Sequence, residues 1–279
     1  MNTLKTALLM IVLTGLFVLV GDQLAGTQGM IIALVLAAGM NFVSYWYSDT
    51  IVLKMYGARE VGENEAPGLY RIVRNLAQKA DIPMPKVHII PHQAPNAFAT
   101  GRDPEHAAVA VTQGILQVLN DRELEGVLAH EISHVDNRDM LISTIAATMA
   151  GALMLLARMG MFAGMFMGGD RRGRGGLGVI VLAIVGAVAA LLIRMAISRS
   201  REYQADADAA RLTGNPDGLA SALTKLERGA EHYRMDTNPS TSHLFIVNPL
   251  KGDWLAKLFS THPSTEDRVN RLMEMRGKV

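Results

Sequence analysis

The stretch His130-Glu131-Ile132-Ser133-His134 places two histidines four positions apart, with a glutamate directly after the first. Positions i and i+4 of an α-helix share a face, so both imidazoles can point at one ion. Asn120, followed three residues later by Glu123, is a capping-box pattern that predicts where this helix begins. The same helix has an apolar stripe formed by Leu124, Val127, Leu128 and Ile132. The stretch therefore predicts a metal-binding helix packed against a core.

Glu131 lies beside the two histidines, in position to reach a metal-bound water. Zinc lowers the pKa of such a water to about 7, and a carboxylate can then take its proton and pass it to a leaving amine. The chain has no cysteine, so metal ligands must be His, Asp or Glu. The pattern predicts one Zn²⁺ per chain, bound by His130 and His134, with Glu131 as the catalytic base.

A catalytic zinc usually has three protein ligands, and the third must come from elsewhere in the chain. No His or Glu lies between His134 and Arg201. Asp136 and Asp139 are interpreted as lying too far along the helix of the histidines or pointing away from the ion. The downstream pattern of metzincins is absent. The first downstream glutamate is Glu202, and elimination points to it as the third ligand.

Asp206 follows Glu202 by one helical turn, on the same face. We expect it to hydrogen-bond a ligand histidine or to orient the site from behind the ligands. The alternative is a solvated carboxylate on a helix surface.

The composition of the 279 residues is strongly apolar, with 49% hydrophobic and 19% charged residues. A net charge of +1 gives no reason to expect nucleic acid as a partner. The apolar residues gather in four segments, and a spanning helix needs about 20 of them. We therefore expect four apolar helices that contact a lipid bilayer, although the first and last segments are short. The segments are 6–21, 23–48, 140–167 and 177–193.

The first apolar segment has an alternative interpretation. Lys5 followed by an apolar run is also typical of a cleaved signal peptide. A second apolar run follows almost at once, and Leu24-Ala25-Gly26 is a poor cleavage site, so we favour a membrane helix.

Basic residues predict the orientation of the chain in the membrane. Lys54, Arg59, Arg71 and Arg74 follow the second segment, so the positive-inside rule places residues 49–139 in the cytoplasm. The loop at 168–176 carries Arg171, Arg172 and Arg174, which would then lie outside. Either the rule fails there or the third and fourth segments enter the membrane only partly, and the sequence leaves both open.

The polar parts of the chain predict an α+β fold that is mostly helical. A helix is expected at 68–80, short strands at 87–90, 96–99 and 107–112, a long loop at 231–264 and a closing helix at 268–275. The predicted organisation is two N-terminal transmembrane helices (1–48), the first part of a cytoplasmic protease domain (49–139), an apolar helical hairpin (140–198) and the second part of the protease domain (199–279). A two-segment hairpin returns Glu202 to the side of His134.

These features together resemble the HtpX family of membrane metalloproteases, distant relatives of the CAAX-prenyl proteases. The resemblance covers essentially the whole chain and includes the stretch 95–101, the HExxH helix and the Glu202-Tyr203-x-Ala205-Asp206 helix. It also includes the stretches 241–246 and 262–265. It implies a gluzincin-type catalytic domain with Glu202 as the third ligand. It further implies a multi-pass protease of the bacterial inner membrane that faces the cytoplasm and degrades misfolded or damaged membrane proteins as a stress response.

Two further sets of residues are candidates on the same resemblance. The residues Asn96, Ala97, Phe98 and Ala99 look like the edge strand that binds substrate in relatives, and an exposed edge can pair with an extended peptide. The alternative is an ordinary transition from loop to strand. His262 could contact Asp206 or stabilise the oxyanion, and the alternative is a surface histidine.

Two rival functions are less consistent with the sequence. In an intramembrane metalloprotease the HExxH motif lies in an apolar spanning helix, whereas here charged residues flank it, which predicts a helix in water. A non-catalytic membrane scaffold with a relic motif would have no need of Glu131. The flanking charges are Arg122, Glu123, Glu125, Asp136 and Arg138.

Overall fold

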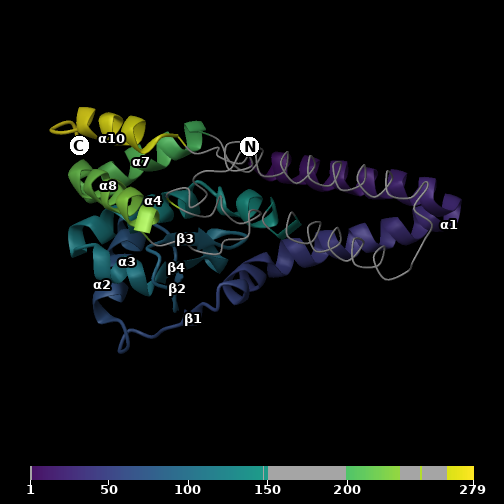
Figure 1. Ribbon diagram of the computed structural model, residues 1–279, viewed down its shortest axis with the longest axis horizontal. Coiled ribbons are helices and arrows are strands. Elements are labelled where there is room, and N and C mark those ends of the chain that lie inside the picture. Colours follow the sequence, from purple (N-terminus) through teal and green to yellow (C-terminus); the bar gives the residue numbers. More distant parts are fainter. Residues whose placement is uncertain (1, 147, 150–198, 233–245, 247–262) are drawn as a thin grey trace.

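The computed structural model describes residues 2–146, 148–149, 199–232, 246 and 263–279. The N-terminal helix α1 (Asn2–Met55) turns back on itself and projects away from the globular part of the molecule (Figure 1). The turn is at Gly26, whose φ of 58° suits glycine. Across the two arms, Asn41 donates a hydrogen bond to the Thr14 hydroxyl at 2.9 Å. The first two apolar segments therefore form a helical hairpin.

Within the part of the chain that the structure describes, one of the four predicted apolar helices has the length and composition of a membrane span. It is Gly26–Met55, with 30 residues and a mean hydropathy of 1.6. The shorter apolar helix Thr6–Leu19 is roughly 20 Å long, less than a hydrocarbon core of about 30 Å. Most of the third segment, from residue 150 on, and the whole of the fourth lie outside the described residues. The expectation of four such helices is therefore supported for one.

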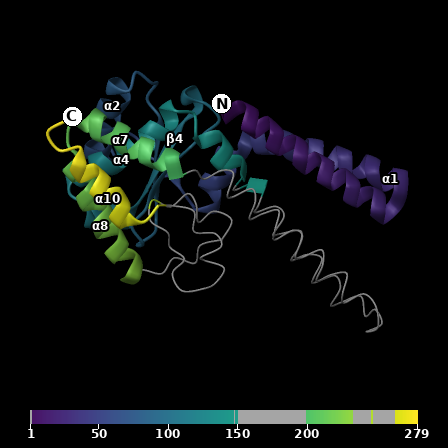
Figure 2. The ribbon, with the colours of Figure 1, turned by 90° about the horizontal axis from the view of Figure 1, so that it is seen from above.

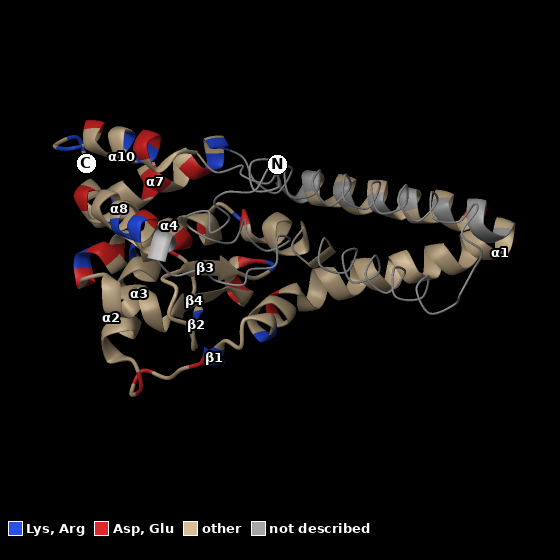
Figure 3. Ribbon diagram, in the orientation of Figure 1, with Lys and Arg blue, Asp and Glu red and all other residues tan. Residues whose placement is uncertain are grey.

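Charge follows the same division of the molecule. Between Asp22 and Asp49, α1 carries no charged side chain, whereas acidic and basic side chains gather on the globular part (Figure 3). Tyr45, Trp46 and Tyr47 lie exposed near the globular end of this stretch, as expected for a membrane interface.

The globular part contains a four-stranded sheet in the order β1-β2-β4-β3. Strand β2 pairs with β4 in parallel, and β1 and β3 add antiparallel edges. The three strands predicted from the sequence are β2, β3 and β4, so their existence is confirmed. The bounds are β1 (Arg59–Glu60), β2 (Lys86–Ile90), β3 (Ala97–Thr100) and β4 (Ala108–Thr112).

The two faces of the sheet pack against different parts of the chain. One face meets the main core, which the helices of the globular part provide. The other face, with Ile90 and Phe98, packs against Val52 and Leu53 at the end of α1. The Phe98 ring lies 5.6 Å from that of Tyr56, centre to centre. The strand nearest the site is therefore packed directly on the apolar N-terminal hairpin.

The helices cover the sheet and surround α4, which carries the HExxH stretch (Figure 2). The predicted helices at 68–80 and 268–275 are confirmed as α2 and α10, with bounds shifted by a few residues. The predicted loop at 231–264 lies almost wholly outside the described residues. The bounds are α2 (Pro67–Lys79), the 3₁₀-helix η1 (Pro104–His106), α3 (Gln113–Val118), α4 (Asp121–Asp136), α7 (Arg199–Thr213), α8 (Pro216–His232) and α10 (Thr265–Glu274).

Candidate metal centre

Helix α4 begins as the sequence predicts. The Asn120 side chain accepts hydrogen bonds from the backbone N–H groups of Arg122 and Glu123, and the Glu123 carboxylate accepts one from the Asn120 N–H. The Glu123 carboxylate also accepts hydrogen bonds from Ser221 and Lys225 of α8. Capping and this buried contact fix the helix, and its i, i+4 geometry brings the Nε2 atoms of His130 and His134 to 3.2 Å.

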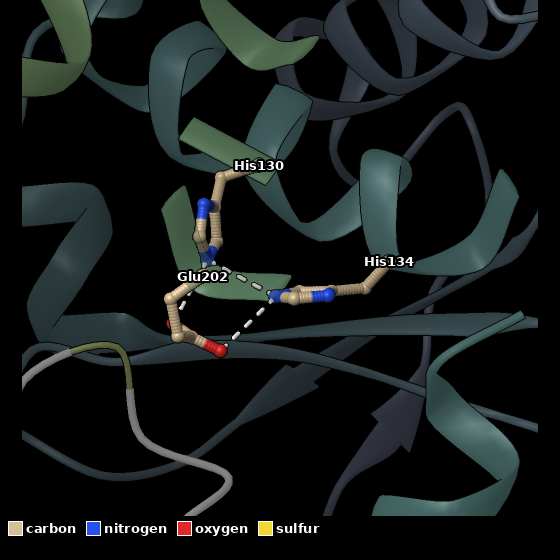
Figure 4. Close-up of side chains that lie close together, drawn as sticks. All are labelled: His130, His134 and Glu202. Atoms are coloured by element: carbon tan, nitrogen blue, oxygen red, sulfur yellow. Dashed lines mark hydrogen bonds and ion pairs between the residues drawn. The ribbon is translucent and has the colours of Figure 1, made fainter. Parts of the chain in front are cut away.

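Glu202 reaches the same point from α7. Its Oε2 lies 3.7 Å from His130 Nε2, and its Oε1 lies 3.6 Å from His134 Nε2 (Figure 4). Among the residues that the structure describes, these three form the one group of potential metal ligands close enough to share an ion. The structure therefore brings together the three residues chosen from the sequence.

The spacing of these atoms fits a zinc ion. Ligand bonds of about 2.0–2.2 Å in a tetrahedron separate the ligand atoms by about 3.3–3.6 Å. The two histidine nitrogens lie 3.2 Å apart, and each lies 3.6–3.7 Å from a different oxygen of Glu202, so the carboxylate stands close to this range from both imidazoles. Two imidazoles and one carboxylate also form a donor set that zinc enzymes use, with the fourth position left for water or substrate.

The charge of the surroundings fits a divalent cation as well. The side chains described around the histidines include four buried carboxylates and the guanidiniums of Arg201 and Arg268. If all four carboxylates are ionised and both imidazoles are neutral, as metal binding requires, two negative charges remain, and unbalanced buried charge is costly. A divalent cation would neutralise them. The carboxylates belong to Glu131, Asp139, Glu202 and Asp206.

His130 is held from behind by Asp206, as the sequence analysis expected. The Nδ1 atom lies 3.0 Å from Asp206 Oδ1, which leaves Nε2 for the ion. Arg268 of α10 donates to both Asp206 oxygens, at 2.6 and 2.8 Å. Burial alone would raise the pKa of Asp206, but the guanidinium and the imidazole lower it to about 2. Asp206 is therefore a buried, ionised partner of His130, and the alternative of a solvated carboxylate is wrong.

His134 is held in the same way by Asp139, so the expectation that Asp139 lies too far along the helix or points away is wrong, although Asp139 is not among the three potential metal ligands. Helix α4 ends at Asp136, and Arg138 adopts a left-handed conformation with φ of 55°. The Asp139 N–H then donates to the His134 carbonyl at 2.9 Å, which closes a Schellman turn. The turn brings Asp139 Oδ2 to 3.3 Å from His134 Nδ1. Asp139, which the sequence suggested lies too far along the helix, is thus folded back onto the end of α4.

His134 also shows the electrostatic effect of this arrangement. Burial alone would lower its pKa, but the hydrogen bond with Asp139 and the charges of Glu202 and Glu131 raise the pKa to about 9. Without a metal the imidazole is protonated at neutral pH, so metal binding has to displace a proton.

Glu131 contacts the edge of β3 that faces away from β4. Its Oε2 accepts a hydrogen bond of 2.8 Å from the Ala99 N–H of β3. Burial raises the pKa of Glu131, and the two imidazoles and the Ala99 N–H partly oppose this. A carboxylate with a raised pKa at a metal site suits proton transfer near neutral pH.

The four candidates at 96–99 divide into two roles. Asn96 is buried, and its side chain accepts a hydrogen bond from the Ile246 N–H, so it ties two segments together. Ala97, Phe98 and Ala99 lie on β3, an edge strand of the described sheet. Because the Ala99 N–H points away from β4, the alternation of an antiparallel pair turns the backbone groups of Ala97 outward too. Among the described residues this edge of β3 has no strand partner, and it runs past Glu131, although the side chains of β3 are buried.

Two further residues, His262 and Arg268, concern the prediction from the sequence. His262 lies outside the described residues, so its predicted contact stays a prediction. Arg268 was missed by the sequence analysis, where it is one arginine at the start of an amphipathic helix. A guanidinium with two buried carboxylate bonds has no sequence signal of its own, since its partner is 62 positions away.

Comparisons with known proteins fit this geometry. Residues 63–276 match Peptidase family M48. A protease HtpX homolog of Desulforapulum autotrophicum is 54% identical over 97% of this chain and 89% of that relative. A protease HtpX homolog of Burkholderia multivorans is 53% identical over 98% of this chain and 97% of that relative. The chain belongs to the HtpX family of M48 peptidases.

The fold of this HtpX family member is also found in a solved structure. The crystal structure of S. mikatae Ste24p has a TM-score of 0.51 and 19% sequence identity, and the match covers 97% of this chain. The chain spans 65% of the length of that protein, and the likeness concerns the fold. Membership of the HtpX family makes the chain a membrane-associated metalloprotease and makes polypeptides its substrates.

Proposed function

We propose that the chain is a membrane-bound, zinc-dependent endopeptidase. In this proposal His130, His134 and Glu202 hold the zinc, and Glu131 is the catalytic base. The proposal rests above all on one observation: three ligand atoms converge beside a buried carboxylate that is fixed by a strand edge. We further propose that it works at the cytoplasmic face of a bacterial inner membrane, which the exposed apolar hairpin α1 and the basic residues that follow it support. The proposal that its substrates are misfolded or damaged membrane proteins rests on the resemblance to the HtpX family.

The proposed roles follow from the positions of the side chains. When bound, zinc would acidify a water and polarise the carbonyl of the peptide bond to be cut. Ala99 fixes Oε2 of Glu131, and we assign proton transfer to the other oxygen, Oε1. This oxygen takes a proton from the attacking water and returns it to the leaving amine. Because the Ala99 N–H is bonded to Glu131, the β3 edge holds the peptide in an extended form by pairing with the outward backbone groups of Ala97 and the Ala99 carbonyl.

The substitution Glu131→Gln tests the catalytic role. It should lower the rate of casein cleavage in detergent by about 100- to 10,000-fold, because the base is lost, while zinc content by metal analysis stays at one per chain. Glu125→Gln, a half-exposed position on the same helix, is the matched control and should keep both properties. Native-rate cleavage by Glu131→Gln would overturn the mechanism.

Pairing with β3 is testable on the substrate. Outward groups on an edge strand alternate, so a bound peptide needs the N–H of every second residue. In a series of peptides that are N-methylated one position at a time, kcat/KM should fall at alternate positions around the cleaved bond. Equal sensitivity at adjacent positions would show that the peptide does not bind as an added strand.

A further inference from the structure

The residues Asp139 and Arg201 stand at the two ends of the apolar region 140–198. Arg201 NH1 lies 3.4 Å from Asp139 Oδ1, in an ion pair that joins positions 62 apart in the sequence. The other oxygen of Asp139 contacts His134 Nδ1 at 3.3 Å. A single buried carboxylate therefore connects a metal-site histidine with the point where the chain leaves for, and returns from, the apolar region.

The backbone before Asp139 is shaped for this contact. A non-glycine residue with positive φ is uncommon, and Arg138 holds φ of 55°. Such a conformation persists where the surrounding structure determines it, and it is enriched at functional sites. Here it allows the Asp139 N–H to bond the His134 carbonyl, so that Asp139 is attached to the residue it contacts by both its backbone and its side chain.

We propose that Asp139 is a positioning residue that orients His134 toward the metal, and that Arg201 in turn fixes Asp139. This rests on the proposed function, since it concerns the same metal. When His134 donates its Nδ1–H to a carboxylate, the ring cannot rotate freely and the lone pair of Nε2 points at the ion. Metal geometry is thereby coupled to the closure of the two ends of the apolar region.

Zinc affinity of the full-length protein in detergent tests the proposal, measured by competition with a chelator. Asp139→Ala should bind zinc about 10- to 100-fold more weakly than the native chain, because the imidazole loses its partner. Asp139→Asn keeps an acceptor oxygen, so its zinc affinity should fall less than that of Asp139→Ala. Asp136→Ala removes the same charge from an exposed position three residues earlier and should bind zinc as the native chain does.

Absorption of the cobalt(II)-substituted proteins separates positioning from a general loss of structure. In Asp139→Asn the visible bands should shift in position or intensity, since they report ligand geometry, whereas those of Asp136→Ala should match the native spectrum. Zinc affinity and cobalt bands of Asp139→Ala and Asp139→Asn that equal those of the native chain would overturn this proposal alone. Failure of the native chain to bind zinc would instead overturn the proposed function.

Discussion

His130 and His134 have outer partners of the same kind that come from different parts of the molecule. Behind His130, Asp206 and Arg268 join two helices of the globular part, and the Arg268 side chain is 2% exposed. Behind His134, Asp139 and Arg201 close the ends of the apolar region, and the Arg201 side chain is 12% exposed. The contact distances also differ, at 3.0 Å for His130 and 3.3 Å for His134.

The difference indicates that the two carboxylate–arginine pairs contribute differently to folding and to metal binding. The pair behind His130 contributes to the folding of the globular part, because Arg268 also donates to the Ile246 carbonyl. The pair behind His134 depends on a turn after α4 and on the return of the chain at α7. We therefore expect stability to depend more on the first pair, while both affect the metal.

Removal of Arg268 should have the largest effect. In Arg268→Met the Asp206 carboxylate stays buried without its cation, which should cost about 3–5 kcal/mol of unfolding free energy, measured by chemical denaturation of the metal-free protein. Arg271→Met is the control on the same helix. Its guanidinium lies over the Tyr203 ring at 3.8 Å and should contribute about 0.5–1 kcal/mol. The loss of unfolding free energy in Arg201→Met should lie between those of the other two variants. A loss as large as that of Arg268→Met would show that stability does not depend more on the pair behind His130.

Zinc affinity sharpens the same comparison. Asp206→Asn weakens the hold on His130, so zinc should bind about 10- to 100-fold more weakly in chelator competition. Because the Asp206 contact is shorter and more deeply buried, the loss should exceed that of Asp139→Asn. The opposite order would mean that the turn after α4, and not the globular part, dominates the geometry of the site.

Acid stability should depend on Asp206. Its pKa in the folded protein is about 2, below the ordinary aspartate value of 3.8, so the ionised form favours folding. That contribution is complete above about pH 4 and is lost as the pH falls toward 2, and it amounts to about 2 kcal/mol. In metal-free protein, unfolding free energy measured against pH should show this loss in the native chain and less of it in Asp206→Asn. Identical slopes for the two proteins would show that the loss of stability at acid pH does not come from protonation of Asp206.

The sequence predicted the local parts of this site well. The i, i+4 spacing of His130 and His134 and the capping box at Asn120 depend on residues within one helix, where geometry follows from spacing alone. Glu202 was reached by elimination, because no His or Glu lies between His134 and Arg201 and Glu202 is the first glutamate after them. The strands could also be predicted from local signals, because they are short apolar runs between turn residues.

The tertiary structure alone decided which groups stand behind these residues. Asp139 is folded back by a turn that has an arginine, not a glycine, in the left-handed position, so the residue types did not predict this turn. Arg268 meets Asp206 only because α10 packs on α7, and β3 becomes an edge only through the order of the four strands. Contacts between distant positions depend on packing, and a single sequence shows which side chains can bind a metal without showing which ones will hold them in place.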